Sequence, residues 1–559
     1  MPVNILVNNN KIKAEKGKML LQVLLDNGIR IPTLCNLSDM LPTGACRLCV
    51  VEIAETGELI PACSTPVTDG LNIFTHSKRV IRARQTIVDL LLTNHPEDCL
   101  YCDKNRNCEL QLLADELNLR ERIFTGRKKI GKIDRSSQGI VLDLSKCILC
   151  GRCVKVCDNI AGVSALDHVY RGKNSSISTV FNKGLYYSTC IQCGQCLNVC
   201  PTGALSEKSN LKQVVERLMI NSQPINAILS TSSIISIADR FGIRKVDDAA
   251  QFIIAAMHEI GFKTVVPEGF GSDVYIIKYG KIINELINRK DFKIIISDCP
   301  AVKQWIELKY PEDLKYLPNF KSAQQIMAKA VHEFSKSPTR IVNVAVMPCI
   351  ARKNEALDVD NLSRGLPDLD YVISTSELLQ LFRTRGITYP FPRKAMFDTP
   401  FVSFSLAAIA SQVSGGLSES IFDTAGHKNF ASAIKSKINN KEAKDFKIIE
   451  SDINGNTFGL AVINGLKSIN QNFENVMNNK DIQFIELTAC KGGCVAGCSQ
   501  LSVNESGIQK IINESIQQTI IRDPNTNPYY KGLVNENKIS DEIIGYKNST
   551  INRYLINEK

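Results

Sequence analysis

KCILCGRCVKVC at Lys146–Cys157 and TCIQCGQCLNVCP at Thr189–Pro201 carry the strongest structural signal in this chain. Both segments follow the spacing C-x2-C-x2-C-x3-C, so the second is an internal repeat of the first. Gly151 and Gly194 occupy the same place in the two runs and permit the tight turn that aims successive thiols at one point. The repeat predicts a domain organised around metal-bound cysteines.

This spacing is the one that binds 4Fe-4S clusters in bacterial ferredoxins. We therefore predict a 2×(4Fe-4S) ferredoxin domain over residues 138–210. In such paired runs the fourth cysteine ligates the cluster of the other run. The predicted ligand sets are Cys147, Cys150, Cys153 and Cys200 for one cluster, and Cys190, Cys193, Cys196 and Cys157 for the other.

The cysteine content of the whole chain also indicates metal. Of the 20 cysteines in 559 residues, most lie in tight groups before residue 201. We expect a cytoplasmic protein, or one of an organelle matrix, because the N-terminus lacks a secretory signal. Thiols stay reduced there, so clustered cysteines indicate metal rather than disulfides. No apolar run of about 18 residues predicts a membrane span, and 22% charged residues suit a multidomain soluble protein.

Residues 1–80 are predicted to form a β-grasp 2Fe-2S ferredoxin domain. The segments 2–7 and 48–53 have the pattern of short strands, with a helical stretch between them at 19–27. Four thiols, the number that a 2Fe-2S cluster requires, lie around this outline. A structural zinc ion is the alternative, because both metals use C-x2-C. The candidate ligands are Cys35, Cys46, Cys49 and Cys63.

Residues 81–125 contain a compact set of one histidine and three cysteines. Zinc would accept these donors as readily as iron. Their position between two predicted iron–sulfur segments favours a 4Fe-4S cluster with one imidazole ligand. Neutral imidazole in place of a thiolate makes a cluster less negative and raises its reduction potential. The candidate ligands are His95, Cys99, Cys102 and Cys108.

Residues 211–559 alternate between helical stretches and apolar β-branched runs, which predicts an α/β domain. Three of these runs end in Cys299, Cys349 and Cys490. Ligands of open α/β sheets bind beyond the carboxyl ends of the strands, so we expect these cysteines to share one site. Cys494 and Cys498 follow in CKGGCVAGC. The alternative is a set of ordinary buried cysteines.

Three segments of this domain resemble the signature segments of the iron-only ([FeFe]) hydrogenase catalytic domain. They are SDCPAVKQW at 297–305, MPCIARKNE at 347–355 and ELTACKGGC at 486–494. With the cysteine-rich modules, the likeness extends over almost the whole chain, in the layout of the larger clostridial-type enzymes. The His95 segment also resembles the cluster site with one histidine and three cysteines that is found in this family and in the large iron–sulfur subunit of complex I.

The resemblance implies a two-lobed α/β domain that holds an H-cluster. This cofactor is a 4Fe-4S cube joined through one thiolate to a two-iron unit with CO, cyanide and a dithiolate amine. The implied ligands are Cys299, Cys349, Cys490 and the bridging Cys494. By segment match, Met347 and Glu355 are further candidate catalytic residues, and the candidate cofactor-binding residues are Ser230, Ser322, Gln324 and Pro348.

The expected surroundings of the two-iron unit depart from the family. Asp298 stands where the family normally has a cysteine that passes protons to the bridging amine, and a carboxyl group has a lower reference pKa than a thiol. Arg352 replaces a lysine that hydrogen-bonds a cyanide, and its guanidinium is bulkier and differently directed. Lys278 and Lys281 fall near the glutamates of the family's proton path. The proton relay is therefore expected to be altered.

The resemblance predicts an enzyme that interconverts H2 with protons and electrons. Its electrons would pass through one 2Fe-2S and three accessory 4Fe-4S clusters to ferredoxin or flavodoxin, or to a flavoprotein or NAD-linked subunit. The alternative is a hydrogenase-like electron-transfer or H2-sensing subunit with little or no turnover. A complex I-type electron subunit would explain the first 110 residues but not the MPC and CKGGC segments.

Charge gives one further expectation. The formal net charge is +10, and the densest basic stretch is Arg120–Arg135. We expect a solvated linker there rather than a nucleic-acid site, with at most a weak attraction to an acidic redox partner. The last 55 residues, rich in Asn and Ile, carry no chemistry that the sequence reveals.

Overall fold

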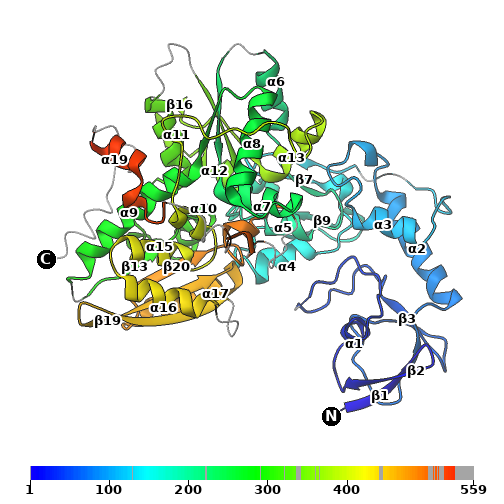
Figure 1. Ribbon diagram of the computed structural model, residues 1–559. Helices are drawn as coiled ribbons and strands as arrows, with labels where there is room; N and C mark the ends of the chain where they lie inside the picture. Colours follow the sequence, from blue (N-terminus) through cyan, green and yellow to red (C-terminus); the bar gives the residue numbers. More distant parts are fainter. Residues whose placement is uncertain are drawn as a thin grey trace. The chain divides into compact units, whose positions relative to one another are not determined.

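The computed structural model forms two compact units (Figure 1). The first comprises Met1–Asn159, Ser164–Cys190 and Gln195–Glu207, and the second comprises Ile160–Val163, Ile191–Gly194 and Lys208–Lys559. Within the described ranges, we find no helix with the length and apolar character that a membrane crossing demands. The structure describes residues 2–38, 40–126, 128, 130–220, 223–289, 291–319, 321–334, 341–358, 361–363, 366–439, 445–501, 508, 510–512, 514 and 521–535.

A five-stranded sheet with the order β2-β1-β5-β3-β4 begins the first unit. Burial alternates along β1, so Val3, Ile5 and Val7 face a core that they share with Leu20 and Leu24 of α1. The predicted strand at 2–7 and the predicted helix at 19–27 are confirmed, and the predicted strand at 48–53 begins two residues later. The bounds are β1 Pro2–Val7, β2 Asn10–Glu15, α1 Leu20–Asp26, β3 Val50–Ile53, β4 Leu59–Pro61 and β5 Asn72–Phe74.

Helices and two small antiparallel sheets make up much of the rest of the first unit. Helix α2 (Lys78–Asn94) begins at Ser77, whose side chain accepts a hydrogen bond from Val80 N, and it ends at His95. Helix α3 (Glu109–Glu116) follows Cys108. A three-stranded antiparallel sheet has the order β10-β7-β6, and β8 and β9 form a hairpin. The strands are β6 Ile133–Asp134, β7 Ile140–Asp143, β8 Asp167–Val169, β9 Ser176–Ser178 and β10 Leu205–Glu207.

The two cysteine runs repeat the same backbone geometry. Leu149 and Gln192, two residues after the first cysteine of each run, both have a left-handed φ of 55°. Gly151 and Gly194 follow with φ of 73° and 74°. Each run then enters a short helix, α4 (Arg152–Asn159) or α5 (Gln195–Val199). The sequence repeat is therefore also a structural repeat.

A parallel four-stranded sheet with the order β12-β11-β14-β17 lies in the second unit. Strands β11 and β14 are buried along their whole length, as expected for strands covered on both faces. One face packs on α7, α8 and α13, and the other packs on α9 and α11. The bounds are β11 Ile225–Leu229, α7 Thr231–Phe241, α8 Val246–Ile260, β12 Thr264–Pro267, α9 Glu268–Leu286, α11 Ala323–Phe334, β14 Val342–Met347, β17 Tyr371–Ser374 and α13 Thr375–Thr384.

A second four-stranded sheet has the order β13-β20-β19-β18, and its β18–β19 pair is antiparallel. The three cysteine-ended runs therefore lie in two sheets, because β14 belongs to the first sheet whereas β13 and β20 belong to the second. Apolar runs predicted each strand but not its neighbours in space. The bounds are β13 Ile294–Ile296, β18 Phe446–Ile453, β19 Asn456–Asn464 and β20 Phe484–Thr488, with helices α10 Pro300–Lys309, α15 Gly416–Thr424, α16 Lys428–Asn439 and α17 Leu466–Asn478.

Part of the C-terminal segment packs on this unit. Helix α19 (Pro528–Asn535) brings the Tyr530 ring centroid to 6.4 Å from that of Phe270 in α9. Most of the last 55 residues, including 536–559, lie outside the described residues.

Candidate functional site

Strands of both sheets in the second unit end at one pocket. In the first sheet, β11 leads to Ser230, β12 leads to Glu268 and β14 leads to Pro348. In the second sheet, β13 leads to Asp298, and β20 ends in Thr488. These residues line a cavity with a volume of about 40 Å³, together with Cys299 and Cys494. The pocket thus occupies the position at which α/β sheets bind their ligands.

The four implied cube ligands lie close to one another. Burial raises the pKa of the Cys349 and Cys490 thiols well above the usual value, and the charges of nearby Cys299 and Cys494 add to this effect. Burial also raises the pKa of Cys494 to about 12, although Arg352 opposes the rise. Thiolates gathered in a buried site repel one another unless cations bind them. The donor set therefore fits an iron–sulfur cube.

A buried ion cluster closes one side of the pocket. Arg352 of α12 (Ala351–Glu355) donates from Nη2 to Asp298 Oδ2 at 2.5 Å and from Nη1 to Glu355 Oε2 at 2.9 Å. Ala323 N, at the start of α11, donates to Asp298 Oδ1 at 3.2 Å. Both carboxylate oxygens of Asp298 are therefore engaged. Because Arg352 follows β14 and Asp298 follows β13, their ion pair joins the carboxyl ends of the two sheets.

Glu268 is an acidic pocket residue that the sequence analysis missed. It opens α9 with only 4% of its surface exposed. Ser272 Oγ donates to Glu268 Oε1 at 3.1 Å, whereas Oε2 is buried without a hydrogen-bond partner among the described residues. Burial, with the charge of Asp298 adding to it, raises the pKa of Glu268 to about 7, although Arg352 opposes the rise. A carboxyl group of this kind can hold and release a proton near neutral pH.

The sequence gives a weak signal for Glu268. It is one acidic residue between Pro267 and Gly269, directly after a buried strand, and no spacing links it to the cysteines. An acidic residue at the end of a predicted parallel strand could have been added to the candidate set on that ground.

The predicted pocket residues divide into two groups. Ser230, Met347 and Pro348 line the pocket, whereas Ser322 and Gln324 do not. Ser230 Oγ also accepts a hydrogen bond from the N–H of residue 233 and so caps α7. A side chain in this position has a structural role in addition to its place in the pocket wall.

Ser322 and Gln324, which do not line the pocket, lie next to Glu355 of the ion cluster. Gln324 Nε2 donates to the Arg352 carbonyl oxygen at 3.3 Å and to Glu355 Oε2 at 3.3 Å. Ser322 and Glu355 line a neighbouring cavity of about 220 Å³, which Asp298 also lines. These side chains can thus act on the pocket through Arg352 and Asp298.

The buried face of helix α9 carries tyrosine hydroxyl groups, whereas its two lysines are half-buried or exposed. Lys281 is exposed, Lys278 is half-buried, and neither lines the pocket. The buried face carries Tyr275, whose OH donates to Ser297 O at 2.7 Å, and Tyr279, whose OH donates to Ile295 O at 3.2 Å. That Lys278 and Lys281 fall near the glutamates of the family's proton path stays a prediction.

Cys498 lies beside the cube ligands. Its charge adds to the effect of burial in raising the pKa of Cys349 and Cys490. A Cβ added at Gly194 would come within 2.3 Å of the Cys498 Sγ, so this contact requires a glycine. Cys498 is thus an additional thiol of the site.

In the first unit, the N-terminal cysteines form two pairs. Cys35 and Cys46 lie within hydrogen-bond reach of each other, and so do Cys49 and Cys63. Leu34 N donates to Cys46 Sγ at 3.4 Å, and Cys46 N donates to Cys35 Sγ at 3.5 Å. Two pairs fit a 2Fe-2S cluster, in which each iron takes two thiolates.

His95 has one free ring nitrogen that is placed to bind metal. Its Nδ1 lies 3.0 Å from Pro96 O, which assigns the proton to Nδ1. Nε2 is then an acceptor, and it is buried without a hydrogen-bond partner among the described residues. Burial raises the pKa of Cys108, and the charges of Cys102 and Cys99 add to the effect. The donor set fits a cluster with one imidazole ligand.

Cys200 lies with the first cysteine run. Burial raises the pKa of Cys150 to about 12, and the charges of Cys200 and Cys147 add to this rise. Cys153 lies so deep that burial raises its pKa well above the usual value, with Cys150, Cys147 and Cys200 adding to the effect. The fold therefore brings the fourth cysteine of one run to the first three of the other.

Comparison with known families defines the class of the molecule. Residues 1–78 match a 2Fe-2S iron–sulfur cluster binding domain, and residues 84–122 match the NADH-ubiquinone oxidoreductase-G iron–sulfur binding region. Residues 137–206 match the ferredoxin-like domain of NADH-quinone oxidoreductase subunit 3, and residues 223–498 match the C-terminal domain of the iron-only hydrogenase large subunit. Fold and site thus define a multidomain iron–sulfur oxidoreductase.

Whole-chain relatives narrow this class. Iron hydrogenase 1 of Clostridium pasteurianum is 31% identical over 530 residues, which cover 92% of each chain. The chain therefore belongs to the iron-only hydrogenase family. The NADP-reducing hydrogenase subunit HndD of Solidesulfovibrio fructosivorans is 29% identical over 518 residues, covering 89% of this chain and 88% of that protein.

A solved structure extends the likeness to the fold. An apo [FeFe]-hydrogenase of Chlamydomonas reinhardtii aligns with a TM-score of 0.50 at 20% identity, covering 60% of this chain and 98% of that chain. At this identity the match shows a shared fold.

Proposed function

We propose that this protein interconverts H2 with two protons and two electrons at the pocket between its two α/β sheets. The observation that supports this function is that four cysteines lie together beside a pocket that also contains acidic groups. The cysteines are Cys299, Cys349, Cys490 and Cys494. These four residues would hold an H-cluster, whose two-iron unit supplies the site of hydrogen chemistry when it is bound. Electrons would pass through the accessory 2Fe-2S and 4Fe-4S sites.

The chain's own residues would orient and protonate this site. Arg352 places a fixed positive charge at the pocket wall, held by Asp298 and Glu355 on either side of it. Met347 and Pro348 supply apolar surface that excludes water. Glu268 retains a free carboxyl oxygen in the same pocket and is the group best suited to hold a proton there.

Infrared spectroscopy and turnover together test this function. After anaerobic maturation of the full chain with a two-iron precursor, we expect bands from CO and cyanide together with H2-dependent reduction of a dye. The matched control is the Cys494→Ala chain, which lacks the proposed bridging thiolate and should show neither signal. Absence of the bands from a chain with intact iron–sulfur clusters would refute the enzymatic function.

A second candidate function is an electron-transfer or H2-sensing subunit with little turnover. It is favoured by the ion pair between Asp298 and Arg352, because a carboxylate with both oxygens engaged is a poor proton relay. This candidate predicts cluster reduction by H2 or a partner protein without sustained dye reduction.

For the electron partner, we infer a flavoprotein or NAD-linked subunit as one option. The support is the likeness to the NADP-reducing hydrogenase subunit and, over 178 residues at 39% identity, to the NADPH-Fe(3+) oxidoreductase subunit alpha of Geobacter sulfurreducens. That second match covers 32% of this chain and 21% of the relative. Ferredoxin or flavodoxin is the other option.

A further inference from the structure

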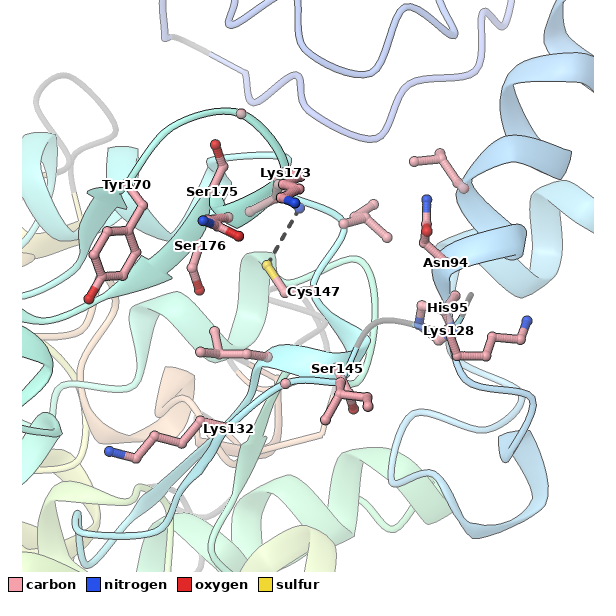
Figure 2. A pocket seen from close by; sticks show the side chains of 18 residues that line it. Asn94, His95, Lys128, Lys132, Ser145, Cys147, Tyr170, Lys173, Ser175 and Ser176 are labelled. Carbon is pink, nitrogen blue, oxygen red and sulfur yellow. Dashed lines mark hydrogen bonds between the residues drawn. The ribbon is translucent and has the colours of Figure 1, made fainter. Parts of the chain in front are cut away.

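A basic cleft in the first unit is separate from the pocket that contains the proposed hydrogen chemistry. Its volume is about 950 Å³. Asn94 at the end of α2 lies on one side of the cleft with Lys128, whereas Tyr170 and Lys173 at the tip of the β8–β9 hairpin lie on the other (Figure 2). Lys132 lines the cleft away from Asn94 and Lys128. No Asp or Glu is among the described residues that line it. The cleft therefore presents positive charge to the solvent.

Two candidate cluster ligands reach this cleft. His95 and Cys147 both line it, and Figure 2 shows them at its two sides. They belong to different predicted clusters, one bound by His95 and one bound by the first cysteine run. A molecule seated in the cleft would therefore approach two clusters of the chain at once.

The lysines supply most of the positive charge. Lys128 forms an ion pair with Glu97 at 3.1 Å. Lys132 and Lys173 are exposed, and neither takes part in an ion pair with an acidic residue of the described part of the chain. Lys128 and Lys132 belong to the basic stretch 120–135, so folding brings part of that stretch to the edge of a redox site.

One exposed aromatic side chain, that of Tyr170, lines the same cleft. Tyr170 is 65% exposed, and Asn182 donates a hydrogen bond to its OH at 2.5 Å. Phe181, next to Asn182, is 85% exposed, and both Tyr170 and Phe181 have left-handed backbones with φ of 62° and 56°. Non-glycine residues keep such conformations at a cost, and exposed aromatic rings are enriched where proteins bind one another.

We propose that this cleft docks a soluble electron-transfer protein whose redox centre is surrounded by acidic residues. The positive charge of the cleft is complementary to the acidic surface of such a partner. The cluster ligands His95 and Cys147 in the cleft would bring the partner's redox centre close to two clusters of this chain. The reduced centre of the partner loses one electron, and a cluster at His95 or Cys147 gains it, with no bond made or broken. The inference rests on the proposed function in one respect, namely that these residues bind clusters.

The test measures electron entry into the full, cluster-loaded chain. An acidic 2Fe-2S ferredoxin, reduced beforehand, is mixed with the oxidised protein, and the bleaching of the chain's clusters is followed by stopped flow at several salt concentrations. The cleft variant is Lys132→Glu/Lys173→Glu. Its matched control is Lys428→Glu/Lys467→Glu, with the same change of charge at exposed lysines of the second unit. Iron content and the spectrum after full reduction verify that every variant holds its clusters.

We expect the second-order rate of the cleft variant to fall about tenfold or more at low salt, and its salt dependence to flatten. The control should stay within about twofold of the unmodified chain and keep its salt dependence. Tyr170→Ala should slow the reaction at high salt as well, because an apolar contact is not screened.

Three results would overturn the docking site. The first is an equal fall of the second-order rate in the cleft variant and the control, and the second is an unchanged rate in the cleft variant. The third is competition by inorganic phosphate at constant ionic strength, which would identify a small-anion site instead. The assay does not use H2. Loss of hydrogen turnover with intact lysine dependence would therefore refute the proposed function and leave the docking site standing.

Discussion

Asp298 and Glu268 are two carboxyl groups in one pocket with different environments. Asp298 accepts hydrogen bonds at both oxygens, from Ala323 N and from Arg352. Glu268 has one free oxygen and a pKa raised from 4.5 to about 7, chiefly by burial. That rise corresponds to roughly 3 kcal/mol, whereas the positive end of α9 favours the charged form by only about 0.3–1 kcal/mol. Desolvation therefore decides the protonation state of Glu268.

Glu268→Gln should lower H2-dependent dye reduction by about 100-fold, because Gln keeps the shape of the side chain but cannot carry the proton. The variant should also lose a transition near pH 7 in the activity profile. The matched control is Glu419→Gln, since Glu419 is a half-buried carboxyl group that does not line the pocket and whose pKa is also raised, chiefly by burial. An unchanged rate and pH profile in Glu268→Gln would exclude Glu268 from proton transfer.

Buried carboxylates fix the helix starts around the pocket. Glu486 of β20 accepts hydrogen bonds from Gly415 N at 2.6 Å and from Ser418 N at 2.8 Å, at the beginning of α15. Asp273 of α9 accepts from Ser405 N at 2.8 Å and from Ser405 Oγ at 2.5 Å, at the beginning of α14 (Leu406–Ala410). Both contacts satisfy main-chain N–H groups that a helix start leaves unpaired.

Asp273→Asn should remove part of the pH dependence of stability. Burial raises the pKa of Asp273 from 3.8 to about 7, so the folded chain holds a proton that the unfolded chain releases. The bound proton therefore stabilises the folded chain. This stabilisation is fully present below about pH 4, and the free energy of unfolding falls by roughly 1.4 kcal/mol per pH unit as the pH rises to about 7. Asn is neutral throughout and can still pair with Ser405. Unfolding in urea between pH 5 and 7 should therefore show a smaller decline for the variant.

The control for this prediction is Asp481→Asn, a change at an exposed aspartate. It should keep the pH slope of the unmodified chain. Parallel slopes for Asp273→Asn and the unmodified chain would mean that Asp273 is ionised in the folded protein.

On the scale of the whole molecule, the 2Fe-2S site, the His95 site and the cube site draw their ligands from separate parts of the chain, whereas the two sites at 147–200 exchange their fourth cysteines. The 2Fe-2S ligands lie within 35–63 and the His95 set lies within 95–108. The cube ligands lie between Cys299 and Cys494 and belong to the second unit alone. Loss of one cube ligand should therefore leave the accessory clusters in place.

Cys490→Ser should remove the cube and all hydrogen turnover while it leaves the accessory clusters in place. Iron content should fall by about four atoms per chain, or more if the two-iron unit is lost as well. Electron paramagnetic resonance of the reduced protein should still show the 2Fe-2S signal and the accessory 4Fe-4S signals. Cys498→Ser is the matched control, and its effect measures whether the additional thiol contributes to the site. Loss of the accessory signals in Cys490→Ser would contradict independent cluster binding.

Local sequence patterns predicted much of the fold. The alternating residues of 2–7 predicted β1, and the cysteine spacing of 147–157 and 190–200 predicted a repeat whose backbone turns recur at Leu149 and Gln192. These features depend on neighbouring residues in the chain, so they can be read from it directly. The assignment of β13 and β14 to different sheets could not be read in this way, because strand pairing depends on residues far apart.

The sequence by itself determined the iron–sulfur character of this protein, because cysteine spacing and the SDC, MPC and ACKGGC segments are local and specific. Tertiary structure alone decided that Asp298 pairs with Arg352, whereas Glu268 keeps a carboxyl oxygen without a hydrogen-bond partner among the described residues. It also decided that lysines from 120–135 and the tip of the β8–β9 hairpin border one cleft with His95 and Cys147. The physical reason is that burial, hydrogen bonding and electric field at a side chain are set by atoms that folding brings from distant parts of the chain.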